Sequence, residues 1–200
     1  VEVLQALRPK GIILSGGPSS VDGDNAPTCD PRILDMGVPV LGVCYGLQLM
    51  CSQLGGRVVP ADKREYGRAK LAVEGRGGMF HGIPSDTSVW MSHGDQIVEL
   101  PDGFETVAAT PTCPFAAVRH PGRNLHGVQF HPEVTHTPHG VEMLRNFLYE
   151  ICGCEGTWRM SDFVETAAAE VRAKVQGARV ICGLSGGVDS SVVAALLHLS

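Results

Sequence analysis

A cysteine between two glycines is the first feature of this sequence that could do chemistry. Cys44 is the centre of GVCYG at 42–46, between an apolar run over 38–43 and a helical pattern over 45–54. A G-x-nucleophile-x-G sequence at a strand-to-helix junction forms a sharp turn that lifts the central side chain clear of the sheet. The helix dipole there favours the thiolate. The pattern predicts a reactive Cys44, the alternative being a small buried side chain.

A thiolate that attacks an acyl carbon needs a base, a group that orients the base, and donors for the oxyanion. His131 and Glu133 follow a strand-like run over 125–129, at the sheet edge where open α/β proteins build their sites. His131 could take the thiol proton and Glu133 could hold the imidazole. The backbone N–H groups of Gly16, Gly17 and Tyr45 could bind the oxyanion. Each residue alone has a structural explanation, but their joint placement at three strand ends favours catalysis.

A second glycine loop lies near the other end of the chain. It separates an apolar run over 179–184 from a helical pattern over 190–199. Backbone N–H groups and a helix dipole that converge in this way bind phosphate. It is not a Walker A loop, because no lysine precedes the hydroxyl residues. The candidate residues are Ser185, Gly186, Gly187, Val188, Asp189, Ser190 and Ser191. The alternative is a turn with no ligand.

The segments that must position these residues alternate between helical and strand patterns. Helical spacing occurs over 1–7, 31–36 and 45–54, and runs typical of strands buried on both faces occur over 11–15 and 38–43. This order predicts an α/β protein with an open, mainly parallel sheet. From 57 to 129, short strand-like runs alternate with turns, which predicts antiparallel additions.

A helix over 140–151 should close the first domain, with one apolar face made of Val141, Leu144, Phe147, Leu148 and Ile151. We expect domain one to be 1–151, a linker to be 152–160, and 161–200 to begin a second, doubly wound α/β nucleotide-binding domain. That part would contain a helix from an N-cap at Ser161 to Gly177, a buried strand over 179–184 and a helix over 190–199. The chain starts without Met and ends inside a helical pattern, so we expect a fragment.

Composition excludes several classes of protein. The 200 residues are 44% hydrophobic and 18% charged, which is globular rather than disordered. A net charge of −5 without a basic run argues against nucleic acid and anionic membranes as partners. No apolar stretch reaches the roughly eighteen residues of a membrane span. Seven cysteines without a C-x-x-C pair indicate a reducing, cytoplasmic setting and no metal site.

Three ordered motifs resemble those of the class I glutamine amidotransferases: SGGP at 15–18, GVCYGLQ at 42–48 and GVQFHPE at 127–133. The resemblance covers 1–151, lacks the family's first strand and helix, and implies a flavodoxin-like sheet. It implies that Cys44 attacks the side-chain amide of glutamine, releasing ammonia and leaving a thioester that water hydrolyses. It further implies that Gln48 and a turn of Ser92, His93, Gly94 and Asp95 hold the amino-acid end of glutamine.

The loop over 185–191 resembles the pyrophosphate loop of the N-type ATP pyrophosphatases, which implies ATP as a substrate with Mg²⁺ beside its β- and γ-phosphates. Both motif groups in one chain, with Trp158 between them, are similar to the glutamine-hydrolysing GMP synthetases. That resemblance implies a ligase, a homodimer at full length, in which ammonia from glutamine aminates adenylated xanthosine monophosphate (XMP). The products would be GMP, AMP, pyrophosphate and glutamate.

Three alternatives stay open. A glutaminase of another synthetase, such as those that make CTP, carbamoyl phosphate or anthranilate, would not carry the loop over 185–191. NAD and asparagine synthetases carry such a loop, but their glutaminase parts resemble different folds. A scaffold that binds a nucleotide without turnover would not need Cys44, His131 and Glu133 intact.

Overall fold

The computed structural model describes residues 1–75, 77–157 and 159–200, apart from the side chains of 62–64. The chain divides into two compact units, Val1–Cys154 and Glu155–Ser200. The division lies inside the linker expected over 152–160, and Trp158 of that linker lies outside the described residues. Each unit is considered by itself.

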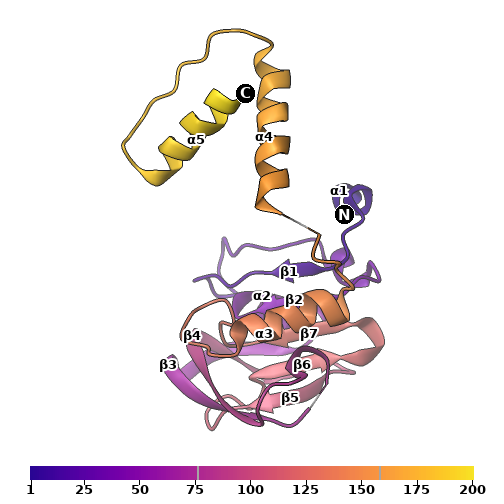
Figure 1. The fold of residues 1–200 in the computed structure, drawn as a ribbon. Coiled ribbons are helices and arrows are strands. Elements are labelled where there is room, and N and C mark those ends of the chain that lie inside the picture. Colours follow the sequence, from indigo (N-terminus) through magenta and orange to yellow (C-terminus); the bar gives the residue numbers. More distant parts are fainter. Residues whose placement is uncertain (76, 158) are drawn as a thin grey trace. The chain divides into compact units, whose positions relative to one another are not determined.

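The first unit is built on a sheet that has seven strands in the described residues, in the order β1-β2-β7-β6-β5-β3-β4 (Figure 1). Only β1, β2 and β7 run parallel to their neighbours, whereas β3 to β6 pair antiparallel. The expected mainly parallel sheet is therefore mixed, because turns rather than helices connect the strands of its second half. The strands are β1 Ile12–Leu14, β2 Val40–Val43, β3 Arg57–Val73, β4 Asp86–Glu99, β5 Glu105–Ala109, β6 Ala117–His120 and β7 Leu125–Val128.

Helices pack on both faces of this sheet. The helical elements are α1 Glu2–Leu7, the 3₁₀ turns η1 Pro31–Asp35, η2 Gly78–Phe80 and η3 Pro121–Arg123, α2 Tyr45–Gln53, and α3 Gly140–Arg145, which continues as the π-helical η4 Asn146–Ile151. Leu47 and Met50 of α2 pack with Val40 in one core cluster. Met143 of α3 and Phe147 of η4 pack with Leu41 in the other. Neighbouring residues of β2 thus point into different cores, and all four residues of this central strand are buried, as its apolar sequence predicts.

Two expectations about burial are wrong. β1 was expected to be buried on both faces, but it is the edge strand and Ile13 is 48% exposed. The helix over 140–151 was expected to bury Val141 and Leu148, but Val141 is 69% exposed and the buried side chains are Met143 and Phe147. The π-helical turn, in which Cys152 N–H bonds Phe147 C=O, changes the helical period and therefore the face that meets the sheet.

The Ser92–Asp95 segment was expected to be a turn but lies inside β4. Polar residues and a glycine are typical of turns, yet pairing with β3 keeps this segment extended, with His93 opposite Glu65 and Asp95 opposite Pro60. The register between these two pairs is irregular, because β3 has extra residues there. The bulge lies beside the candidate site.

The second unit contains α4 Met160–Val175 and α5 Val188–Leu199. The N-cap of α4 is Arg159 rather than Ser161, whose hydroxyl donates instead to the Asp162 carboxylate at 3.1 Å. No strand occurs over 179–184 or elsewhere in the described part of this unit, and Ile181 is 99% exposed. A strand buried on both faces needs neighbouring strands, which this part of the chain does not supply.

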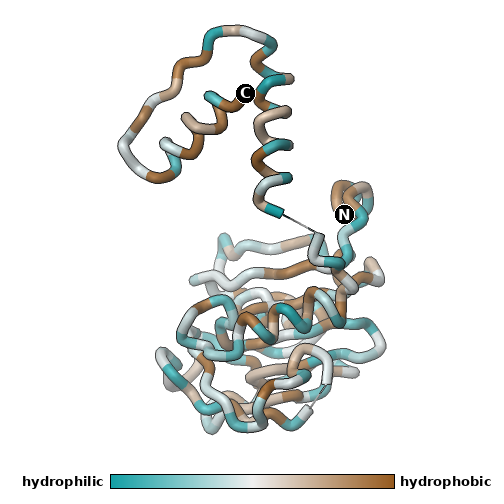
Figure 2. The backbone as a smooth tube through the Cα atoms, viewed as in Figure 1, coloured by the Kyte–Doolittle hydropathy of each residue, from teal (hydrophilic) through white to brown (hydrophobic). Residues whose placement is uncertain are grey.

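Apolar side chains of α5 and of the segment before it are exposed, including Leu184, Val188, Val192 and Val193 (Figure 2). The 155–200 segment therefore forms two helices and a connecting loop, not the nucleotide-binding domain that the sequence predicted.

The core of the first unit gives a test of the fold. Leu47 is fully buried between α2 and the sheet, so Leu47→Ala should lower the free energy of unfolding by about 2–5 kcal/mol. Leu148→Ala is the control, because Leu148 is partly exposed on η4 and should cost less than half as much. Urea unfolding of the three proteins measures both values, and equal losses would contradict the packing of α2.

Candidate active site

Cys44 occupies the turn between β2 and α2 in a strained backbone conformation. Its φ is 49° and its ψ is −107°, a region that residues with a side chain rarely adopt, and the residue is only 3% exposed. The Cys44 N–H bonds the Val128 carbonyl of β7 at 2.7 Å, and its carbonyl accepts the Gln48 N–H at 3.1 Å. Hydrogen bonds to the sheet and to the helix thus hold the turn on both sides.

The glycines beside Cys44 are required by close packing rather than by their own backbone angles. A Cβ atom at Gly46 would overlap the Leu14 carbonyl of β1, and one at Gly42 would lie 2.6 Å from the Leu47 nitrogen. Both glycines let α2 lie directly against β1 and β2. The N-terminus of α2 is therefore fixed behind the sulfur, where its dipole favours negative charge.

His131 and Glu133 follow β7 and form an ion pair. Nδ1 of His131 lies 2.6 Å from a Glu133 carboxylate oxygen, and the described residues offer no hydrogen-bond partner to the buried Nε2. The Cys44 sulfur raises the pKa of His131 from 6.5 to about 9, and Glu133 adds to this rise against the lowering effect of burial. An imidazolium is thus favoured beside a thiolate at neutral pH.

Thr137 holds the loop that carries His131. Its hydroxyl donates to the His131 carbonyl at 2.6 Å and accepts the Trp90 N–H of β4 at 3.1 Å, while the His131 N–H bonds the Trp90 carbonyl at 3.0 Å. The sequence analysis missed Thr137, because nothing in a lone threonine six residues beyond the histidine signals this contact.

The predicted oxyanion donors lie beside the sulfur and the histidine. A Cβ at Gly16 would lie 3.0 Å from Cε1 of His131 and 3.6 Å from Cβ of Cys44, so only glycine fits without moving the imidazole. Gly17 lines the same pocket. Tyr45 is the first residue of α2, so its N–H has no partner within the helix. All three backbone groups can therefore approach a bound substrate.

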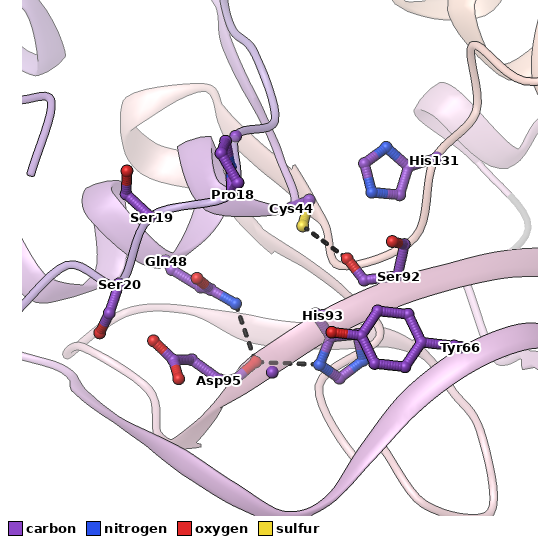
Figure 3. Close-up of a pocket in the computed structure, with 12 residues that line it drawn as sticks. Pro18, Ser19, Ser20, Cys44, Gln48, Tyr66, Ser92, His93, Asp95 and His131 are labelled. Atoms are coloured by element: carbon purple, nitrogen blue, oxygen red, sulfur yellow. Dashed lines mark hydrogen bonds between the residues drawn. The ribbon is translucent and has the colours of Figure 1, made fainter.

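The Cys44 side chain opens into a cavity of about 550 Å³ (Figure 3). It brings together residues from five parts of the chain: Gly17, Pro18, Ser19, Ser20, Cys44, Gln48, Tyr66, Ser92, His93, Gly94, Asp95 and His131. Pro18, Ser19, Ser20 and Tyr66 were not predicted. The first three continue the glycine turn, whereas only the pairing of Tyr66 with Ser92 across the β3–β4 hairpin brings Tyr66 to the pocket.

The residues predicted to hold glutamine bond one another. Nε2 of Gln48 donates to the Asp95 carbonyl at 2.9 Å and to Gln129 at 3.2 Å, so both of its N–H groups are used. His93 is buried and bonds the Asp95 carbonyl and Glu65. The oxygen of Gln48, the Ser92 hydroxyl and the Asp95 carboxylate remain to meet a ligand. The glutamine-binding roles of Gln48 and Ser92–Asp95 stay a prediction.

The phosphate-loop candidates lie in the second unit at the start of α5. Gly187 caps the helix, and the hydroxyls of Ser190 and Ser191 donate to its carbonyl at 3.0 and 2.9 Å. Ser185 donates to the Ser190 hydroxyl at 3.1 Å. The loop is exposed, and the first N–H groups of α5 are free of helical partners.

Neither a metal cluster nor a membrane helix is found in 1–75, 77–157 and 159–200. No three His, Cys, Asp or Glu side chains of these residues gather as ligands, and none of their helices is long and apolar enough to cross a bilayer.

Comparison with known families identifies the fold and the site. The model of the glutamine amidotransferase class-I family matches residues 1–151. The chain belongs to this family. A Thermoplasma acidophilum structure, assigned to one of the two chains of a GMP synthase, shares 36% identity and a TM-score of 0.61, over 72% of this chain and 73% of its own. A Thermotoga maritima glutamine amidotransferase, 19% identical with a TM-score of 0.56 over 95% of this chain and 75% of its own, shares the fold.

Curated relatives extend the similarity into the second unit. The glutamine-hydrolysing GMP synthase of Syntrophomonas wolfei is 54% identical over 197 residues, and that of Thermosynechococcus vestitus is 55% identical over the same length. Both matches cover 98% of this chain but only 39% and 37% of the relatives. The chain is thus a glutamine amidotransferase domain, homologous to the N-terminal part of GMP synthases, that spans less than two fifths of their length.

The raised pKa of His131 gives a test of the site. Because the Cys44 sulfur is its main cause, Cys44→Ala should lower the pKa of His131 from about 9 towards 6.5. NMR titration of the imidazole Cε1–H measures the shift, and His131→Gln assigns the resonance. Cys29→Ala, which removes a thiol remote from His131, is the control and should leave the value near 9. An unchanged value in Cys44→Ala would show that sulfur and imidazole do not interact.

Proposed function

We propose that this chain is the glutaminase part of an enzyme that forms GMP from XMP, ATP and glutamine. The observation that carries the glutaminase half is the strained Cys44 at the N-terminus of α2, with His131 kept protonated beside it. The synthetase half is supported by the identity to GMP synthases over 197 residues, a match too long to be confined to 1–154.

In the proposed reaction the Cys44 thiolate attacks the side-chain carbonyl carbon of glutamine. The N–H groups of Gly17 and Tyr45 stabilise the oxyanion, and the imidazolium of His131 gives its proton to the departing nitrogen, which leaves as ammonia. His131 is then a free base, held in orientation by Glu133. It takes a proton from water as the water attacks the thioester, and glutamate leaves as the thiolate reforms.

The pocket lining suits the amino-acid end of glutamine. The Asp95 carboxylate and the oxygen of Gln48 would accept from the α-ammonium group, and the hydroxyls of Ser19 and Ser20 would donate to the α-carboxylate. A cavity of about 550 Å³ leaves room for this small substrate and a water molecule.

In the same proposal, Ser185–Ser191 bind the β- and γ-phosphates of ATP with Mg²⁺, once the rest of the enzyme completes the domain. ATP adenylates the C2 oxygen of XMP, and the ammonia displaces AMP. The XMP site and a homodimer contact would lie in the part of the relatives that this chain does not span. The enzyme would act in the cytoplasm, in keeping with its free cysteines.

Replacement of the nucleophile separates the two half-reactions. Cys44→Ala should abolish glutamine hydrolysis and glutamine-dependent GMP formation in the full-length protein, while synthesis from ammonium persists. Isotope-labelled glutamine, with and without XMP, follows both products. Cys29→Ala is the matched control and should keep both activities. Loss of ammonium-driven synthesis in Cys44→Ala would refute the two-site scheme, and a wild-type protein without glutaminase activity would favour a scaffold.

Replacement of the loop carboxylate tests the ATP site. Asp189→Ala should suppress both ammonium-driven and glutamine-driven GMP synthesis in the full-length protein by an order of magnitude or more, since both need adenylated XMP. Asp162→Ala in α4 is the control, with an equally exposed carboxylate remote from the loop in sequence. Unchanged synthesis in Asp189→Ala would refute the assignment of the loop.

A further inference from the structure

A buried relay of hydrogen bonds begins at the backbone carbonyl of Asp95. This oxygen lies 2.9 Å from Nε2 of Gln48 and 2.9 Å from Nδ1 of His93. A carbonyl can only accept, so both nitrogens must donate to it. The carbonyl therefore fixes which end of the Gln48 amide faces it, and it places a proton on Nδ1 of His93.

The orientation of Gln48 determines that of Gln129. The second N–H of Gln48 points to Oε1 of Gln129 at 3.2 Å. If the Gln129 amide were flipped, two NH₂ groups would face each other without an acceptor. Oε1 must therefore face Gln48, which leaves Nε2 of Gln129 directed at the Cys44 sulfur, 3.6 Å away. A backbone carbonyl of β4 thus determines which group the nucleophile meets from the protein interior.

We propose that Gln129 is a further catalytic residue, whose side-chain N–H donates to the thiolate of Cys44. This rests on the proposed role of Cys44 as nucleophile. The sulfur lies between an acceptor and a donor, because the Ser92 carbonyl is 3.6 Å away on one side and Gln129 on the other. The thiol can donate to Ser92, whereas only the thiolate gains a charge-assisted bond from Gln129.

Burial makes this donor effective. Gln129 is 1% exposed, so water does not compete for its N–H groups, and a buried amide is costly unless both ends are bonded. The neighbouring Phe130 is an equally buried apolar residue, so packing alone does not call for an amide here. Structural satisfaction explains the bond to Gln48, but the bond to sulfur places a donor on the reacting atom.

His93 and Glu65 support the far end of the relay as positioning residues. They lie opposite each other on β4 and β3, and Nε2 of His93 is 3.2 Å from a Glu65 carboxylate oxygen. Both side chains are largely buried. The titratable groups that face the relay and the sulfur are therefore this pair from the hairpin, and His131 with Glu133 from the loop after β7.

The test measures how the alkylation of Cys44 by iodoacetamide depends on pH, with the Cys44 peptide quantified by mass spectrometry in the whole chain. Gln129→Met keeps the size of the side chain and removes the donor. The pH midpoint of alkylation should rise by roughly one unit in this variant. Gln129→Glu keeps an acceptor for Gln48 but faces the sulfur with a carboxylate oxygen, so its midpoint should rise further. The kcat for glutamine should fall at least tenfold in both, with KM changed less than threefold.

Gln53→Met is the matched control, because it removes an amide from the same helix that bonds Thr28 and Cys29 instead of the sulfur. Its midpoint should equal that of the wild type. A wild-type midpoint in folded Gln129→Met or Gln129→Glu would overturn the inference, and Gln129→Glu decides alone if the Met variant does not fold. Since alkylation needs no glutamine, a wild type that fails to hydrolyse glutamine would instead refute the proposed function.

Discussion

The close contact of α2 with the parallel strands constrains the backbone of Cys44, and the rest of the site depends on that contact. Gly42 and Gly46 remove the side chains that would hold the helix away from β1 and β2. The chain must then reverse within one residue, and Cys44 takes a φ of 49°. Packing of Leu47 and Met50 in the core offsets the cost of this conformation. The strain is therefore local, while its support is distributed over the fold.

Charge is arranged around this fixed sulfur from three directions. The N-terminus of α2 lies behind it, His131 stands beside it with a raised pKa, and Gln129 donates from the interior. All three favour the thiolate, and the positively charged His131 is also the group that must give up a proton to the leaving nitrogen. One ion pair thus prepares both the nucleophile and the acid, which is why the imidazole must be protonated before the reaction begins.

Local motifs made part of the fold and site predictable. The buried strand β2, helix α2 and the elbow follow from apolar runs and glycine spacing within a dozen residues, and His131 and Glu133 follow from a strand end. The contacts that cross the chain could not be predicted. Tyr66 reaches the pocket only through its register with Ser92, and Glu65 meets His93 only because β3 bulges. The strand expected over 179–184 is absent, because an apolar run becomes a strand only when it has a partner.

The central claim is that Cys44 is the nucleophile on glutamine, and a glutamine analogue with a diazoketone in place of the amide tests it most directly. Whole-protein and peptide mass spectrometry would locate the adduct among the seven cysteines. The account predicts one adduct per chain, on Cys44, with glutamine hydrolysis lost in proportion to labelling and protected by glutamine. Full modification of Cys44 with hydrolysis retained, or labelling of a different cysteine in its place, would contradict it.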